Sequence, residues 1–411
     1  MRKRNMSEMV RETREDLERC NENASLRLKA TAFIRERRLG AKLLLTMILS
    51  RLYKALQLEI DDFYEGLGLA PVSKQAFSKA RQQLNPEIVR GFFDRSAQIG
   101  AEDPTLSHYR GMRLIAIDGS YIELENTKEL RQAFGCSGPG DGQATALSSI
   151  AYGPLDHVIY DCRIAPCARD ERALAREHLE RLCELGFKGS LLLFDRGYPS
   201  ADFIAYLTQM AFPFVMRVRK KWNLQVDDIK TQGQIAFTHE GVSYTVRVLK
   251  VLLPSGETET LLTSLPKCKL ALRDAAALYF KRWTIETAFD LIKSKLQLEN
   301  FSGKTRVSVL QDFYATMYLA NLVAFTDGVA DQMIAAADLG KDLAYKRQAN
   351  RNRSIHKLRN LFVRLLLEPD PKIRDALLAR LFDAVAMRPF SIVPERDVPR
   401  RPPRIKRLPY R

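Results

Sequence analysis

The spacing of hydrophobic side chains along the chain changes several times, and each change predicts a different kind of segment. Residues 1–110 carry apolar residues three to four positions apart among Arg, Lys, Glu and Ala, which predicts a mostly helical region. Within it, the stretch PVSKQAFSKARQQLNPE has a helix start at Ser73 and a stop near Asn85. This short helix presents three cations, Lys74, Lys79 and Arg81. It either lies on DNA or forms an ordinary solvated face.

From Arg113 onward, short apolar runs end in turn residues. RLIAIDGS predicts a buried strand, and ATALSSIAYGPLDHVIYDCRIAP predicts two strands joined at a tight turn. A helix (ARDERALAREHLERLCELGF), a strand (SLLLFDRGYPS), a second helix (SADFIAYLTQM) and a strand (FPFVMRVR) follow. Strands that first pair as a hairpin and then alternate with helices predict a mixed α/β sheet.

The rest of the chain predicts five parts in all. Residues 213–264 hold several β-rich runs separated by turns such as PSGE, which predicts an all-β insertion. Helical patterning resumes at Leu272, and VLQDFYATMYLANLVAFTDGVADQMIAAA predicts an apolar core helix. We therefore divide the chain into an N-terminal helical region, a core in two pieces, the insertion, a C-terminal helical region and a basic tail: 1–110, 111–212 with 265–330, 213–264, 331–390 and 391–411.

Charge narrows the class of partner. The 411 residues include 65 Lys and Arg against 49 Asp and Glu, a formal net charge of +16. Such an excess on a globular composition indicates a polyanionic partner, most often nucleic acid, with a merely basic soluble protein as the alternative. Two clusters concentrate the charge: Lys346 to Arg364 holds seven cations and no acids, and the tail from Ser391 holds seven cations and two acids.

Several other classes of protein are disfavoured. The charged start lacks the apolar segment of a signal peptide, and no run reaches the roughly 18 apolar residues of a membrane span. The six cysteines show no zinc-type spacing; we interpret the nearest pair, Cys162 and Cys167, as structural and expect a reducing compartment. No P-loop, GxGxxG or GxSxG motif occurs.

The stretch YFKRWTIETAFDLIK, Tyr279 to Lys293, has an unusual distribution of polar residues. At the period of an α-helix, Tyr279, Arg282, Glu286 and Lys293 project at roughly 0°, 300°, 340° and 320°. A ring, two cations and a carboxylate on one narrow face suit the binding of a metal ion and a phosphate better than they suit packing. The opposite side carries Ala288, Leu291 and Ile292, which suit a core.

Two aspartates complete a candidate set of carboxylates. Asp118 follows the strand LIAI, and Asp195 follows the strand LLLF 77 positions later. If these strands are parallel neighbours, a helix across the same edge brings Glu286 to them. Converging carboxylates require a cation, and hard oxygen ligands select Mg²⁺ or Mn²⁺. Two such ions about 3.5–4 Å apart suit phosphodiester hydrolysis or strand transfer.

Each carboxylate also has an ordinary interpretation. Either aspartate could be a turn residue, and Glu286 could simply pair with Arg282 one helical turn earlier. Asp290 lies on the same face as a rival ligand, with Glu123 and Asp141 as lesser rivals.

Asp118 in AIDGS, Asp195 in LFDRGYPS and the Y-x2-R-x3-E-x6-K helix together resemble the insertion-sequence-four family of bacterial transposases, of the DDE class. SKQAFSKAR, LENFSGKT and QDFYA also resemble segments of that family, so the resemblance covers most of the chain. It implies a ribonuclease-H-like α/β fold: a mixed sheet flanked by helices, with an all-β insertion and helical N- and C-terminal regions. Residues 1–110 would then bind the ends of the transposon DNA.

The resemblance also implies roles for the site residues. Asp118, Asp195 and Glu286 would bind catalytic Mg²⁺, with Mn²⁺ as a substitute. Tyr279 and Arg282 would engage backbone phosphates near the transposon end, and Lys293 would contact the end DNA. The partners would be double-stranded DNA, at transposon ends and at the target, and a second copy of the chain in a synaptic homodimer. No membrane is involved, and the place of action would be the bacterial cytoplasm, on the nucleoid when DNA is bound.

A hairpin at the transposon end needs a flipped base stacked on an aromatic ring. Trp283 projects beside the catalytic residues and is the candidate, or else a packing residue at the helix edge. Trp222, after a cationic run in the insertion, does not match the position of the family's tryptophan and receives no such role. The function predicted is cut-and-paste transposition at terminal inverted repeats. The alternatives are a ribonuclease-H-like nuclease without strand transfer and a domesticated DNA-binding protein that has lost catalysis.

Overall fold

The computed structural model describes residues 2–22, 24–29, 31–34, 38–50, 55–105, 107–138, 142–253 and 256–393. The chain forms two compact units. The first, here called the helical unit, comprises Met1–Asp103, Glu123–Ala133 and Leu291–Arg411; the second, the sheet unit, comprises Pro104–Ile122 and Phe134–Asp290. These boundaries do not follow the five-part division made from the sequence, which stays a prediction.

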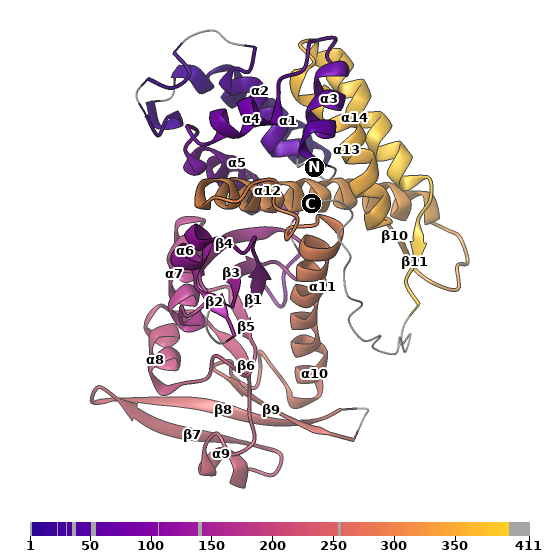
Figure 1. The fold of residues 1–411 in the computed structure, drawn as a ribbon. Helices are drawn as coiled ribbons and strands as arrows, with labels where there is room; N and C mark the ends of the chain where they lie inside the picture. The colour runs from indigo at the N-terminus through magenta and orange to yellow at the C-terminus, as the bar shows by residue number, and fades with distance from the viewer. Residues whose placement is uncertain are drawn as a thin grey trace. The chain divides into compact units, whose positions relative to one another are not determined.

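One mixed sheet dominates the sheet unit (Figure 1). Its order is β2-β3-β1-β5-β6-β9-β8-β7, and β4 pairs with β3 off this path. The strands are β1 Leu114–Glu123, β2 Cys136–Ser137, β3 Gln143–Tyr152, β4 Ile159–Pro166, β5 Leu191–Phe194, β6 Phe214–Val218, β7 Gln232–His239, β8 Val242–Leu252 and β9 Thr258–Thr263. β5 runs parallel to both β1 and β6, and β3 runs antiparallel to β4. A hairpin followed by parallel crossover strands is the predicted ribonuclease-H-like α/β class, which is confirmed.

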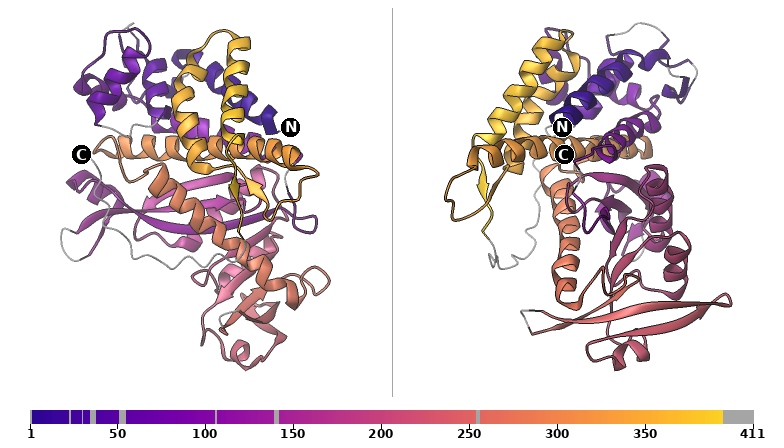
Figure 2. Two further views of the ribbon diagram at one scale, coloured as in Figure 1. Left: turned by 90° about the vertical axis from the view of Figure 1, so that its right-hand side faces the viewer. Right: turned by 180° about the vertical axis from the view of Figure 1, so that it is seen from behind.

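Helices cover both faces of the central strands. All four residues of β5 are fully buried, as expected for a parallel strand covered on both sides. Helices α7 (Glu171–Glu184) and α8 (Ala201–Gln209) lie on one face, and α10 (Leu272–Phe280) with α11 (Thr284–Asp290) runs along the other (Figures 1 and 2). Asp170 and Ser200 start the first two helices, because their side chains accept hydrogen bonds from Ala173 N and Phe203 N.

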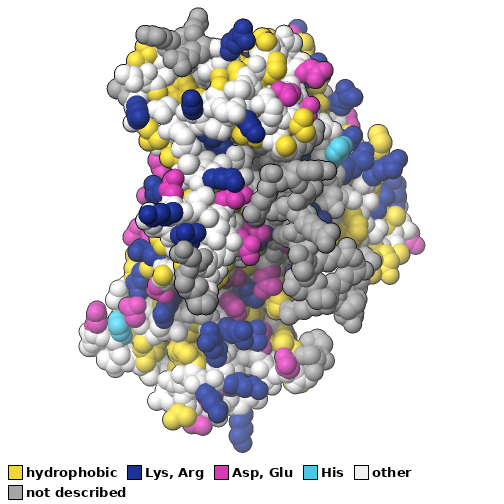
Figure 3. All heavy atoms as spheres, in the orientation of Figure 1, with side chains coloured by type: hydrophobic (Ala, Val, Ile, Leu, Met, Phe, Trp, Pro, Cys, Tyr) yellow, Lys and Arg dark blue, Asp and Glu magenta, His cyan; other side chains and the backbone are white. Residues whose placement is uncertain are grey.

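The β-rich segment predicted at 213–264 contains β6 to β9 and continues the central sheet, because β9 pairs with β6. It also contains a short helix, α9 (Leu224–Asp228), that the strand-like composition did not predict; Asn223 caps it by accepting from Gln225 N. Figure 3 shows Lys and Arg side chains gathered on this part of the unit. Arg219, Lys220 and Lys221 at its start are exposed.

The helical unit is built around one long helix, α12 (Arg306–Asp338), which is buried over most of its length, as the apolar run predicted. Around it pack α1 (Arg2–Glu18), α2 (Ala41–Ser50), α5 (Pro86–Ala101), α13 (Arg351–Leu367) and α14 (Pro371–Ala386). The remaining elements are α3 (Leu56–Glu65), α4 (Lys74–Arg81), α6 (Lys128–Phe134), the 3-10 turns Cys20–Glu22 and Ala24–Leu26, and the small hairpin β10 (Arg347–Gln348) and β11 (Phe390–Ser391). No described helix is long and apolar enough to cross a membrane.

The basic segments found in the sequence divide into exposed and internal cations. On α4, Lys74 and Lys79 are exposed, whereas Arg81 is 1% exposed and bonded within the unit. In the cluster from residue 346 to 364, Arg347 pairs with Asp338 and Arg351 pairs with Asp327, so part of its charge is neutralised internally. The basic tail after residue 393, and the rival ligand Asp141, lie outside the described residues.

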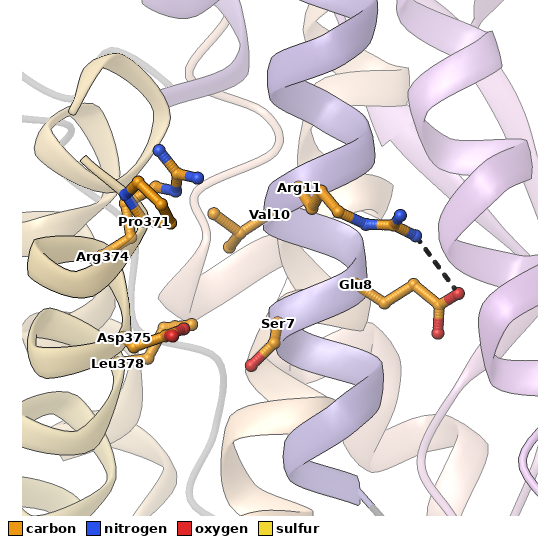
Figure 4. A pocket seen from close by; sticks show the side chains of 8 residues that line it. All are labelled: Ser7, Glu8, Val10, Arg11, Pro371, Arg374, Asp375 and Leu378. Carbon is orange, nitrogen blue, oxygen red and sulfur yellow. Dashed lines mark ion pairs between the residues drawn. The ribbon is translucent and has the colours of Figure 1, made fainter. Parts of the chain in front are cut away.

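The pocket of about 400 Å³ in Figure 4 lies in the helical unit, between α1 and α14. Glu8 and Arg11 form an ion pair at 3.6 Å on one wall, opposite Arg374 and Asp375. None of the carboxylates predicted to bind metal lines this pocket.

Candidate active site

The two predicted aspartates occupy matching positions on neighbouring strands. In the parallel pair β1 and β5, Leu114 lies beside Leu191 and Ala116 beside Leu193, an offset of 77 residues. Asp118 and Asp195 have the same offset (195 − 118 = 77) and follow the last paired residues by two positions. Neighbouring strands lie about 4.8 Å apart, so the two side chains leave the same edge of the sheet on the same face. One detail of the prediction was wrong: Asp118 does not follow its strand, because β1 continues to Glu123.

The surroundings of these aspartates favour a bound cation. Burial, and secondarily the charges of Asp195 and Glu171, raise the pKa of Asp118 to about 7, although the Gly119 N–H and Arg282 act in the opposite direction. The Gly119 N–H donates to Asp118 Oδ1 at 2.9 Å. Asp195 Oδ1 is buried and accepts no hydrogen bond from any described residue. A buried carboxylate oxygen without a donor is costly unless something binds it.

Arg282 links the aspartates to the third carboxylate. Its guanidinium lies 3.5 Å from Asp118 Oδ2 and donates to Glu286 Oε1 at 3.1 Å, while Arg282 itself is only 2% exposed. The Nε and Nη1 groups make no hydrogen bond within the described residues. Burial alone would lower the pKa of Arg282, but Tyr279, Asp195, Glu286 and Asp118 raise it. Arg282 thus stands as a cation at the point where Asp118 and Glu286 converge.

The helix carrying these residues is not a uniform α-helix. α10 passes into a 3-10 turn, Lys281–Trp283, then into α11, and the chain continues as a π-helix at Leu291–Lys295. The angles expected from a constant 100° per residue are therefore changed on both sides of Glu286. Such interruptions are frequent at functional sites. The predicted packing face is confirmed, because Ala288, Leu291 and Ile292 are all buried.

The residues assigned to DNA occupy different environments. The Tyr279 hydroxyl donates to the Phe194 carbonyl at 3.2 Å in a buried site, and burial raises its pKa. Trp283 is half-buried with the Arg282 guanidinium 5.3 Å from its ring centroid. Lys293 belongs to the helical unit, where its Nζ lies 4.0 Å from a Glu299 carboxylate oxygen. Their contacts with DNA stay predictions.

The rival ligands and Trp222 also have definite places. Asp290 and Glu123 are exposed. The indole N–H of Trp222 donates to the Pro199 carbonyl at 3.2 Å, so this residue fastens the loop after Asp195 to the insertion.

The carboxylates suit a divalent metal ion by the chemistry of their donors. All are hard oxygen ligands, and the unpartnered Asp195 Oδ1 and the desolvated Asp118 both favour a cation. Among the described residues, no three acidic, His or Cys side chains are close enough to share one ion. Glu286 is 47% exposed and its carboxylate is held by Arg282, so the set would have to close around a metal by releasing that contact.

A buried hydrogen-bond network behind Asp118 was not predicted from the sequence. The Ser149 hydroxyl donates to the Asp118 carbonyl at 3.3 Å, and His178 joins Ser149 to Asp161 through contacts of 2.9 and 2.7 Å. All three side chains of this network are fully buried, which excludes a hydrolytic serine triad despite the order of groups. The network fixes the backbone that carries Asp118. His178 stood in no motif, and only the fold brings it beside Ser149.

Comparison with known proteins identifies the class. Residues 109–322 match the family model described as the transposase DDE domain, more than half of the chain, and the chain belongs to that family. The match contains Asp118, Asp195 and Glu286. Members of this family generally work with divalent metal ions.

Two individual proteins are similar to the chain. Transposase InsG for insertion sequence element IS4, of Escherichia coli (strain K12), is 24% identical over 287 residues, which span 65% of this chain and 62% of that protein. A cryo-EM structure of the piggyBac transposase synaptic complex with hairpin DNA aligns over 92% of this chain and 82% of that one, at 11% identity and a TM-score of 0.45.

Proposed function

We propose that this protein is a DNA transposase that excises and inserts an insertion sequence by metal-dependent cleavage and strand transfer at terminal inverted repeats. The observation that carries the proposal is the matched register of Asp118 and Asp195 on adjacent parallel strands, with Glu286 joined to Asp118 through Arg282. Membership of the transposase DDE family supports it.

Asp118, Asp195 and Glu286 would hold Mg²⁺, or Mn²⁺ in its place. When bound, these ions would supply Lewis-acid stabilisation of the charge that develops on the phosphate and on the leaving oxygen. The reaction would break the bond between phosphorus and the 3′ oxygen as a water oxygen attacks. The freed 3′-hydroxyl would then attack the phosphorus of a second phosphodiester and displace the 3′ oxygen of that linkage. Tyr279, Arg282 and Lys293 would position the backbone phosphates, and Trp283 would stack on a flipped base.

Two features decide what Arg282 can do in that mechanism. It is buried and already carries Asp118 and Glu286, so engaging a phosphate requires the carboxylates to pass to the metal ions. Its Nε–H and one Nη are free of hydrogen bonds with the described residues, so donors remain for a phosphate oxygen. We infer that binding of the ions releases Arg282 toward DNA.

The partners proposed are double-stranded DNA, at the element ends and at the target, and a second copy of the chain in the synaptic complex. The net charge of +16 favours DNA as the partner. The affinity of the protein for DNA should then fall steeply as the salt concentration rises. Such a protein would act on the bacterial nucleoid, in the cytoplasm.

The test is an incubation of the purified chain with a linear fragment bearing the element's terminal inverted repeats, with Mg²⁺ or with a chelator. Cutting at the repeat end that is lost with chelator, and lost in Asp118→Ala, Asp195→Ala and Glu286→Ala, is the expected result. Metal-dependent cutting without preference for the ends would instead indicate a nuclease without strand transfer. Binding without cutting would indicate a domesticated DNA-binding protein.

A further inference from the structure

A fourth carboxylate, Glu171, stands at the edge of the sheet where the two aspartates project. It is the first residue of α7 and is half-buried. A Cβ placed on Gly119 would lie 3.4 Å from its carboxylate carbon, and a Cβ placed on Gly197 would lie 3.7 Å from its Oε2. Gly119 follows Asp118 directly and Gly197 comes two residues after Asp195, so this carboxylate lies beside the backbone next to both aspartates.

Gly119 and Gly197 matter for the absence of a side chain and not for an unusual backbone conformation. Neither has a φ in the left-handed range, so other residues could adopt these conformations. A side chain at position 119 would press on Leu147 at 3.2 Å and on Glu171 at 3.4 Å. Glycine at position 119 therefore lets the Glu171 carboxylate approach the backbone beside Asp118, whereas at position 197 a Cβ would make only an ordinary contact at 3.7 Å.

Glu171 has no cation of its own. It makes no hydrogen bond or ion pair within the part of the chain that the structure describes, apart from electrostatic coupling to its acidic neighbours. Burial, then Asp170 and Asp195, raise its pKa, and Glu171 in turn raises the pKa of Asp118. Another nearby acid, Glu259, differs in that Arg217 neutralises it at 3.2 Å.

A second, independent group points to a missing ligand at the same place. The Tyr198 side chain is 1% exposed, and its hydroxyl has no hydrogen-bond partner among the residues described. Burial first, then the charges of Asp118, Glu171, Asp195 and Asp170, raise its pKa well above the usual value, so these carboxylates lie within electrostatic range of the hydroxyl. A buried hydroxyl is normally hydrogen-bonded, and none of the described residues bonds this one, so its surroundings suit an additional polar ligand.

Charge makes the same case. Asp118, Asp195, Glu171 and Glu286 contribute four carboxylates, and among the described residues Arg282 is the one cation in contact with any of them. Like charges brought together are tolerated only when a cation compensates them or when they take up protons. A divalent ion at the ends of β1 and β5 supplies the missing charge and gives the Tyr198 hydroxyl a hydrated neighbour.

We propose that Glu171 is a fourth acidic residue of the metal site, where it binds the water shell of the divalent cation held by Asp118 and Asp195, so the three carboxylates need not contact one ion together. This inference rests on the proposed function of that site. It assigns to Glu171 a role in holding the ion, while Glu286 approaches from the opposite face of the sheet.

The experiment measures Mn²⁺ binding directly, without DNA and without turnover. Full-length protein is titrated with Mn²⁺, and free Mn²⁺ is followed by its electron paramagnetic resonance signal. Glu171→Gln should weaken binding on the order of tenfold, the lower end of what loss of a supporting group costs a metal site. Glu180→Gln, which removes the same charge from an exposed position on the same helix, should bind as the unaltered protein does.

Asp195→Asn separates failure of this inference from failure of the proposed function. If Asp195→Asn loses Mn²⁺ and Glu171→Gln binds normally, the metal site stands and the role of Glu171 is overturned. If neither change affects Mn²⁺ binding, the metal site itself is overturned. Circular dichroism establishes that each variant is folded. Should Glu171→Gln not fold, Glu171→Asp takes its place: its shorter side chain should also weaken binding, and unchanged binding would contradict the proposal.

Discussion

Each unit of this protein has a buried arginine beside an aspartate, and the two arginines differ in how many of their nitrogens form hydrogen bonds. In the helical unit, Arg81 is 1% exposed and every nitrogen of its guanidinium is bonded: Nε to Gln311, Nη1 to Ser302, and Nη2 to Ser308 O and Asp312. In the sheet unit, Arg282 is 2% exposed, yet its Nε and Nη1 have no hydrogen-bond partner among the described residues.

The difference separates a structural ion pair from a functional one. A buried cation whose donors are all hydrogen-bonded stabilises the fold, and removing it leaves its buried acidic partner without a counter-charge, at a large cost in unfolding free energy. A buried cation with unbonded donors can form further hydrogen bonds when a ligand binds. We therefore expect substitutions around Arg81 to change stability and substitutions around Arg282 to change chemistry.

The largest expected effect is on catalysis. Asp195→Asn removes a ligand whose Oδ1 is already unpartnered, so cleavage of the repeat end should fall by roughly a thousandfold or more while the melting temperature is kept. Gel assays of end cleavage and calorimetry on the same preparation check both parts. Retained cleavage would remove Asp195 from the site.

Arg81→Met should act on stability instead. It leaves Asp312 buried at 3% exposure without its cation, which should cost about 3–5 kcal/mol of unfolding free energy. Lys79→Met, an exposed cation two residues earlier on α4, serves as the control and should cost little. Urea titrations compare the two, and equal stability of both variants would contradict the structural role given to Arg81.

The third prediction concerns pH in the metal-free protein. Burial raises the pKa of Asp118 to about 7 from an ordinary value of 3.8. Between these two pH values, the Asp118 carboxyl is therefore protonated in the native state and ionised in the unfolded state. Stability attributable to Asp118 is therefore lost as pH rises from about 4 to 7. Asp118→Asn should stabilise the protein more at pH 8 than at pH 5, by roughly 2 kcal/mol. Chemical denaturation at both pH values in chelator measures this, and an effect independent of pH would refute the buried state of Asp118.

The smallest effect is expected from Arg282→Met. Its hydrogen bonds are few, and Glu286 is half-exposed and can be solvated, so unfolding free energy should fall by only about 1 kcal/mol. Both variants are measured by urea titration under the same conditions. If Arg282→Met lost as much unfolding free energy as Arg81→Met, the contrast between the two arginines would be contradicted.

Much of the sheet unit was predictable because its pattern is local. The apolar runs that precede Asp118 and Asp195 are short, and the separation of 77 residues between the two aspartates is the offset that the parallel register needs. The sequence could not show that these strands are neighbours, nor that the chain returns Arg282 between the carboxylates. The prediction also used a constant helical period for Tyr279 to Lys293, a stretch that changes from an α-helix to a 3-10 turn, back to an α-helix and then to a π-helix.

The environments of Glu171 and Arg81 could not be predicted from the sequence, because they depend on contacts between residues far apart in the chain. No motif in the sequence singles out Glu171, which is an acid in the first turn of α7, where a negative charge favours the helix dipole in any case. Its place beside Gly119 and Gly197 follows only from the packing of α7 on the sheet. In the same way Arg81 read as a surface cation, because nothing local revealed that residues 302–312 enclose it.

If Asp118, Asp195 and Glu286 hold divalent metal ions in one site, iron-directed cleavage should locate all three. Fe²⁺ substituted for Mg²⁺, with ascorbate and peroxide, cuts the backbone next to the residues that bind it. The fragments should end near residues 118, 195 and 286, should be suppressed by excess Mg²⁺ and should be absent in Asp195→Asn. Cuts confined to other segments, or cuts that persist unchanged in Asp195→Asn, would contradict a shared metal site.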